Sequence, residues 1–160
     1  YNKGLTETEE VLNIQMNVTP NTSVTQFISN YTFDMVKDMN DDTMSKLQGE
    51  LSRGIMNAEG SEQLKVRVQK VMNVSAARAR AIARTESHRA FNEGAHESAK
   101  QSGLKLKKVW FNPSPEAAVC KKLAGTSVPM GKTFKYKGEE FVKPPAHVNC
   151  RSKIMYVQVD

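Results

Sequence analysis

Apolar residues recur every three or four positions in the first part of the chain, a spacing that predicts amphipathic helices. One such helix is expected over residues 24–39 and a second from Met44 to about residue 58. Short polar side chains between them form an N-cap cluster at Asn40–Thr43, where a helix can start. Gly49 and Gly54 lie inside the second helix, and each costs about 1 kcal/mol relative to alanine. Close helix packing would explain these glycines, and a weak helix is the alternative.

Two further helices are expected before the pattern changes. Ser61 is placed to cap a short helix, because its hydroxyl can accept a hydrogen bond from a free N–H of the first turn. Ser75 is placed in the same way before the strongest helical pattern, Ala76 to about Gln101. Gly103 follows as its C-terminal stop, since glycine readily adopts the left-handed conformation that ends helices.

After Gly103 the period falls to about two, which is typical of strands. Strands are expected at Leu104–Phe111 and Ser152–Val159, with a hairpin over Phe134–Val142 that turns at Gly138. The sequence therefore predicts an α+β fold. Its N-terminal helices, including one long arginine-rich helix, would pack on a small C-terminal antiparallel sheet.

Composition adds a charge pattern to this picture. The 160 residues carry a net charge of +6, with acidic residues frequent in residues 1–62 and a basic balance from Lys65 onward. This balance fits either a basic soluble surface or contact with nucleic acid or an acidic partner. The arginines of the long helix are spread around it, which weakens the interpretation of direct insertion into a DNA groove. The basic candidates for partner contact are Arg78, Arg80, Lys105, Lys107 and Lys108.

No apolar run approaches the roughly 18 residues of a membrane span, so no membrane partner is expected. The chain begins with Tyr1 and not with Met, and we expect it to be part of a longer polypeptide.

Glu86 falls on the apolar arc of the long helix, beside Ile82 and Ala83. An unpaired buried charge is expensive, so we expect a partner, either Arg89 three residues on or a group outside the helix. In one interpretation the pair fixes how the helix docks; in the other, Glu86 is a catalytic acid or base. The lack of a nearby nucleophile or second carboxylate favours the first. His88 and His96 are interpreted as surface residues.

Cys120, His147 and Cys150 are the soft-ligand candidates. His147 and Cys150 are separated by two residues, a spacing that lets both face one ion. A closed structural zinc site needs four ligands, and the nearby sequence offers three. Two buried thiols with a hydrogen-bonded histidine, or a disulfide, are the alternatives. We therefore expect no cofactor. Zinc is the one alternative, and its set of ligands is incomplete.

An Ala-Arg-Thr-Glu block at residues 83–86 of the long helix is followed by Trp110, by the segment Cys120–Gly125 and by the loop Pro144–Arg151. These motifs in this order resemble the Mu F-like minor head protein domain, or head morphogenesis domain, of tailed phages over roughly residues 65–157. The chain departs from the family pattern at Ala117 and Ser152, where the family has cysteines, and at Val148, where it has proline. Two of the family's four cysteines are thus replaced, so the resemblance implies that this chain has lost any family metal site and keeps the fold through packing. The matching helix block, strand and loop positions include Arg84, Thr85, Glu86, Arg89, Trp110, Cys120, Leu123, Gly125, Pro144, Pro145, His147, Cys150 and Arg151.

The resemblance implies a non-enzymatic minor head protein that acts in head morphogenesis near the portal. Its implied partners are the portal and capsid proteins, with packaged DNA as a further contact and no small-molecule substrate. It implies assembly in the host bacterial cytoplasm and a final place inside the head of the virion. Residues 61–160 would form the Mu F-like domain, and residues 1–60 an N-terminal arm and helices that contact partners. The alternatives are a stand-alone nucleic-acid-binding module or a nuclease-like or toxin-like enzyme using Glu86, His147 and Cys150.

Overall fold

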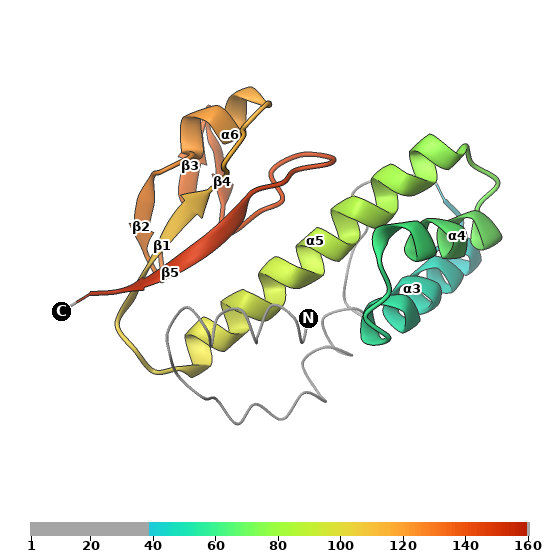
Figure 1. The fold of residues 1–160 in the computed structure, drawn as a ribbon, viewed down its shortest axis with the longest axis horizontal. Helices are drawn as coiled ribbons and strands as arrows, with labels where there is room; N and C mark the ends of the chain where they lie inside the picture. Colours follow the sequence, from blue (N-terminus) through green and yellow to red (C-terminus); the bar gives the residue numbers. More distant parts are fainter. Residues whose placement is uncertain (1–38, 160) are drawn as a thin grey trace. The chain divides into compact units, whose positions relative to one another are not determined.

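The computed structural model describes residues 39–159 of the chain (Figure 1). The helix expected over residues 24–39 lies outside this part except for Met39. The described residues divide between Ser87 and His88 into two compact units. Helix α5 (Ala76–Gln101) contributes residues to both, with the bounds and the Ser75 cap expected from the sequence: Ser75 Oγ accepts a hydrogen bond from Arg78 N at 3.2 Å.

The first unit is helical and consists of α3 (Asp41–Met56), α4 (Ser61–Val71) and the beginning of α5. Asn40 caps α3, because its Oδ1 accepts a hydrogen bond from Thr43 N at 2.9 Å. The predicted cap at Ser61 is wrong by one position. Gly60 is the N-cap of α4, and its own N–H donates to Gln63 Oε1 at 2.9 Å. The core of this unit consists of Leu47, Leu51, Leu64, Val68, Met72, Ala79, Ile82 and Ala83.

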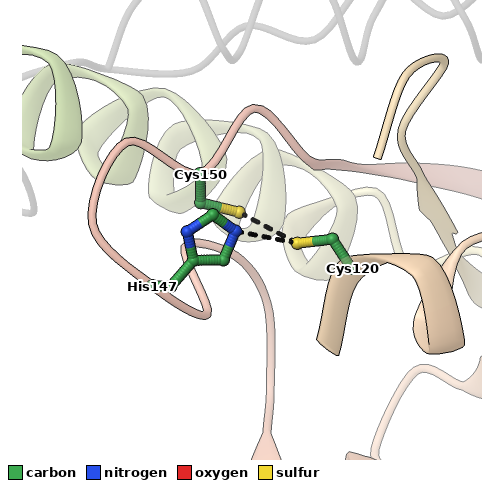
Figure 2. Close-up of side chains that lie close together, drawn as sticks. All are labelled: Cys120, His147 and Cys150. Carbon is green, nitrogen blue, oxygen red and sulfur yellow. Dashed lines mark hydrogen bonds between the residues drawn. The ribbon is translucent and has the colours of Figure 1, made fainter. Parts of the chain in front are cut away.

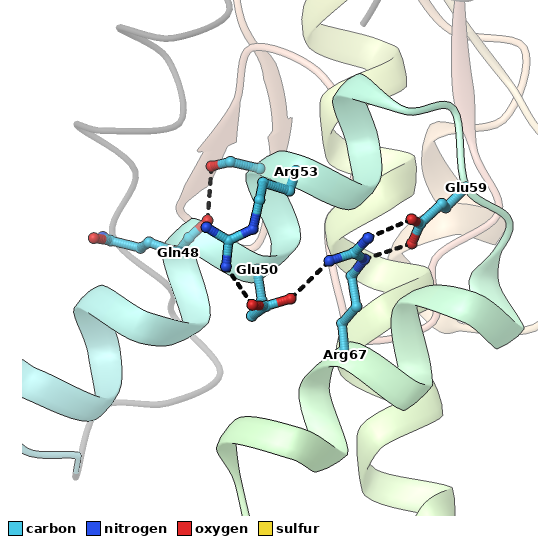
Figure 3. Close-up of polar contacts among 6 residues, drawn as sticks. Gln48, Glu50, Arg53, Glu59 and Arg67 are labelled. Carbon is cyan, nitrogen blue, oxygen red and sulfur yellow. Dashed lines mark hydrogen bonds and ion pairs between the residues drawn. The ribbon is translucent and has the colours of Figure 1, made fainter.

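Close packing of α3 on α4 explains one of the two helical glycines. A methyl group at Gly54 would overlap Leu64 Cδ2, whereas at Gly49 it would meet only Arg53 Nη1 at 3.9 Å. An ion-pair network spans the same contact (Figure 3). Arg67 donates two hydrogen bonds to the Glu59 carboxylate, at 2.5 and 2.6 Å, and one to Glu50 at 2.7 Å.

The second unit holds the sheet. Strand β1 (Leu106–Phe111) is central and pairs antiparallel with β2 (Ser127–Pro129) and β5 (Lys153–Gln158). A separate hairpin joins β3 (Phe134–Tyr136) to β4 (Glu139–Phe141). It turns through Lys137 and Gly138, whose φ angles of 48° and 85° fit a two-residue hairpin turn with both central residues left-handed. The two expected strands and the hairpin are therefore confirmed.

Two short elements of this unit escaped the sequence patterns, α6 (Ala118–Leu123) and β2. Six and three residues are too few to show a hydrophobic period, and β2 exists because it pairs with β1. Gly125 follows α6 with a φ of 78°, and its N–H donates to the Trp110 carbonyl at 2.9 Å.

Trp110 lies at the centre of the second core and is fully buried. Its ring meets those of Phe134 and Phe141 edge to face, with centroids 5.1 and 6.2 Å apart. Helix α5 contributes Ala95 and Ala99 to this core. Helices followed by a small antiparallel sheet make an α+β fold, as predicted. Among the described residues no helix is both long and apolar enough to cross a membrane.

Candidate functional site

Three soft-ligand side chains converge in the sheet unit (Figure 2). Cys120 comes from α6, while His147 and Cys150 come from the loop between β4 and β5. Cys120 Sγ lies 3.1 Å from His147 Nε2 and 3.6 Å from Cys150 Sγ, and all three ligand atoms lie within 4.8 Å of one another. The three residues that the sequence suggested as metal ligands are thus brought together.

Neighbouring polar groups orient this Cys120–His147–Cys150 cluster. His147 Nδ1–H donates to the Val148 carbonyl at 2.8 Å, which leaves the Nε2 lone pair directed at Cys120. Ser152 Oγ donates to Cys120 Sγ at 3.2 Å and accepts from Asn112 Nδ2 at 3.0 Å. Burial raises the pKa of the Cys120 thiol to about 11.

The backbone of Ser152 is tied to α5. His88 Nε2–H donates to the Ser152 carbonyl, and Asn92 Nδ2 donates to the same oxygen at 3.4 Å. Asn92 Oδ1 in turn accepts from Ile154 N at 3.3 Å. Lys143, in the loop before His147, forms an ion pair with Glu93 of α5 at 2.8 Å. Helix α5 therefore holds both ends of the segment that carries two of the cluster's residues.

The interpretation of both helix histidines as surface residues is wrong. His88 is partly buried against Ser152, and His96 is buried with its Nδ1 3.1 Å from the Tyr156 hydroxyl. Burial, with a smaller contribution from nearby lysines such as Lys143, lowers the pKa of His96 to about 3. The spacing of His88, Asn92 and His96 by four residues was the sequence signal for one helix face toward β5.

Lys108 does not fit the predicted surface contact, because its side chain is fully buried. Its ammonium donates to the Val142 carbonyl at 2.8 Å and lies 5.6 Å from the centre of the Phe134 ring. Burial lowers the pKa of Lys108 to about 8. The alternation Leu106, Lys108, Trp110 already placed this lysine on the inner face of the strand.

The other predicted basic contacts are placed as follows. Arg78 and Lys105 are exposed, and Lys107 is half-buried. Arg80 pairs with Glu62 through an Nε–Oε1 contact of 2.8 Å, which links α5 to α4 within the helical unit. The two arginines belong to the helical unit and the two lysines to the sheet unit. Their role in binding a partner stays a prediction.

The Ala-Arg-Thr-Glu block lies on α5, and its residues divide between surface and core. Thr85 and Glu86 are buried, and Thr85 Oγ1 donates to the Ala81 carbonyl at 2.8 Å. Arg84 is exposed and Arg89 is half-buried. Burial of Glu86 agrees with its place on the apolar arc, while its pairing with Arg89 stays a prediction.

This helix block, the buried tryptophan strand and the Cys/His loop belong to a small α+β domain, and the comparisons with known proteins give its family. A family model described as "Phage Mu protein F like protein" matches residues 45–155. The chain belongs to this family, so the resemblance noted in the sequence is confirmed. The match begins within α3, earlier than the boundary predicted at residue 60, which itself stays a prediction.

The chain is also similar to a curated protein, "Minor head protein GP7" of Bacillus phage SPP1. The two are 35% identical over 118 residues, which cover 67% of this chain and 38% of that relative. The chain therefore spans about two fifths of the relative's length. No solved structure matches the chain significantly.

Proposed function

We propose that this protein is a minor component of the head of a tailed phage and acts in head morphogenesis. The observation that carries the proposal is membership of the Mu F-like family together with 35% identity to a minor head protein. The role is structural and not enzymatic. Its buried Glu86 and the oriented Cys120–His147–Cys150 cluster stabilise the domain in this proposal and do not turn over a substrate.

The proposed partners are the portal and capsid proteins of the same phage. The protein would be assembled with them in the host bacterial cytoplasm and would remain inside the head, near the portal. Similarity to a minor head protein supports partners within the phage head. The net charge of +6 also favours contact between exposed basic residues and packaged DNA.

A capture experiment tests this proposal. The immobilised chain is incubated with the portal protein and, separately, with the major capsid protein encoded by the same phage, at low and at high salt. Capture of the portal that survives high salt is expected, because a specific interface with an apolar centre is screened less than a purely ionic contact.

Matched variants locate the surface. Charge reversal at exposed Arg78 or, in a separate variant, at exposed Arg84 probes the helical unit, and charge reversal at exposed Lys105 probes the sheet unit. Each of these reversals changes the net charge by two. Lys132→Glu, at an exposed position between β2 and β3, makes the same change elsewhere and serves as the control. Failure to capture either partner, combined with steeply salt-dependent DNA binding, would instead identify a stand-alone DNA-binding module.

A further inference from the structure

We propose that Cys120, His147 and Cys150 form a binding site for one zinc ion, with a fourth coordination position open to an exchangeable ligand such as water. The site would join α6 to the loop between β4 and β5. This inference does not depend on the proposed role in the phage head.

The first argument is geometric. Zinc bonds of about 2.3 Å to sulfur and about 2.0 Å to nitrogen, at tetrahedral angles, place two ligand sulfurs about 3.8 Å apart and a sulfur and a nitrogen about 3.5 Å apart. The corresponding distances from Cys120 Sγ are 3.6 Å to Cys150 Sγ and 3.1 Å to His147 Nε2. These two distances lie within a few tenths of an ångström of those that zinc requires. The third pair, Cys150 Sγ and His147 Nε2, lies within 4.8 Å and would close to about 3.5 Å through rotation of the two side chains.

The second argument concerns the groups behind the ligands. Metal-binding histidines usually donate the other ring N–H to a carbonyl or carboxylate, and His147 Nδ1–H donates to the Val148 carbonyl at 2.8 Å. The Ser152 hydroxyl, held by Asn112, donates to Cys120 Sγ at 3.2 Å and would stabilise a thiolate there. Two of the three ligands are thus oriented by hydrogen bonds before any ion binds.

The third argument is charge. Both cysteines are buried, so two uncompensated thiolates would be costly. On binding, each thiol loses its proton to solvent, and the two thiolates balance the charge of Zn²⁺. The resulting Cys₂His complex is electrically neutral. A neutral complex suits a buried position on the edge of an apolar core that includes Cys120, Cys150 and Leu123.

The fourth position determines how tightly the ion is held. Ser152 Oγ is the side-chain oxygen nearest the cluster in the described contacts, and a neutral hydroxyl is a poor zinc ligand. Replacing Ser152 by cysteine would put a thiol beside Cys120 and close the coordination shell. The same geometry predicts a weaker site in the natural chain than in Ser152→Cys.

The test uses the full chain, reduced and stripped of metal with a chelator. After addition of zinc and removal of excess by dialysis, mass spectrometry of the metal content should show about one ion per chain. With cobalt as a spectroscopic substitute, we expect thiolate-to-metal charge transfer and the intense visible bands of a four-coordinate site. Competition with a chromophoric chelator gives the affinity.

Substitution of the ligands shows whether the bound zinc lies at this cluster or elsewhere on the chain. Cys120→Ser, Cys150→Ser and His147→Gln should each weaken zinc binding by about tenfold or more, because each removes a direct ligand. Val148→Ala is the matched control in the same loop, since its exposed side chain is not a ligand. Ser152→Cys should tighten binding by about tenfold or more. Circular dichroism of Trp110 in the near ultraviolet shows whether each variant is folded.

Three results would overturn the proposal: no zinc retained by the folded, reduced chain; equal affinity in the ligand variants; or an unchanged cobalt spectrum in Ser152→Cys. If a ligand variant does not fold, the proposal is still tested by the zinc retained by the natural chain and by the cobalt spectrum of Ser152→Cys. Ready formation of a Cys120–Cys150 disulfide, without zinc binding by the reduced chain, would identify a thiol pair instead.

Discussion

At the scale of single residues, Lys108 is the most unusual group of the sheet unit. An ammonium ion is strongly hydrated, and here it is buried with one carbonyl acceptor, Val142 O, and one aromatic face, Phe134. These contacts offset only part of the lost hydration, since the pKa of Lys108 falls to about 8. The long apolar stem of the lysine still fills the core beside Trp110.

This burial predicts a pH dependence. Between pH 8 and the ordinary lysine pKa of 10.5, the unfolded chain holds a proton that the folded chain has lost, so the free energy of unfolding rises with pH. In Lys108→Met this contribution disappears. Relative to the variant, the natural chain should therefore gain up to about 3 kcal/mol across that interval.

Urea unfolding of both proteins at several pH values measures the difference. Lys107→Met is the control, because Lys107 points to the opposite, partly exposed face of the same strand. A difference between the natural chain and Lys108→Met that stays constant from pH 8 to 10.5 would contradict the prediction.

At the scale of elements, the packing of α3 on α4 rests on a position without a side chain. Gly54 lies against Leu64 and the stem of Arg67, and the Glu50–Arg67–Glu59 ion pairs lie beside it. The hydrogen bonds from Arg53 and Arg67 lower the pKa of the Glu50 carboxyl, and that from Arg67 lowers the pKa of Glu59. The close approach of α3 to α4 and the ion pairs of Arg67 with Glu50 and Glu59 thus depend on the same glycine.

The two glycines of α3 form a matched pair for mutation. Gly54→Ala should destabilise the helical unit by about 1–3 kcal/mol, because the added methyl group overlaps Leu64. Gly49→Ala should stabilise it by about 0.5–1 kcal/mol, because alanine favours the helix and the position is open. Thermal unfolding followed by far-ultraviolet circular dichroism measures both. Equal effects of the two substitutions on stability would show that helix propensity, and not the contact with Leu64, determines the outcome.

At the scale of the whole molecule, the described residues form two apolar clusters with no member in common, one in each unit. Mutations far apart and without shared partners act independently in most proteins. Each unit should therefore respond on its own to the loss of a core side chain.

Leu64→Ala and Leu106→Ala test this independence. Each should cost about 2–5 kcal/mol through the lost contacts and the cavity. Native-state hydrogen exchange should show Leu64→Ala lowering protection in α3 and α4 while β1 and β5 keep theirs. Leu106→Ala should have the opposite effect. Equal loss of protection in both units after either substitution would mean that the two cores unfold as one.

The sequence by itself determined the elements that rest on local periodicity and capping. A period of 3.6 predicts helix α5, a period of 2 predicts strands β1 and β5, and a glycine at a left-handed turn predicts the β3–β4 hairpin. Each of these signals is local in the sequence. The family also followed from the sequence, because its motifs are short and ordered along the chain.

Only the tertiary structure decided which groups several side chains contact. The hydrogen bonds of Lys108 with Val142 and of His96 with Tyr156 depend on segments packed over them, and α6 and β2 are too short to be specified without their partners. Cys120 lies 27 residues before His147 and 30 before Cys150, and nothing local brings the three together. Their convergence arises because α5, through His88, Asn92 and Glu93, holds the loop that carries His147 and Cys150.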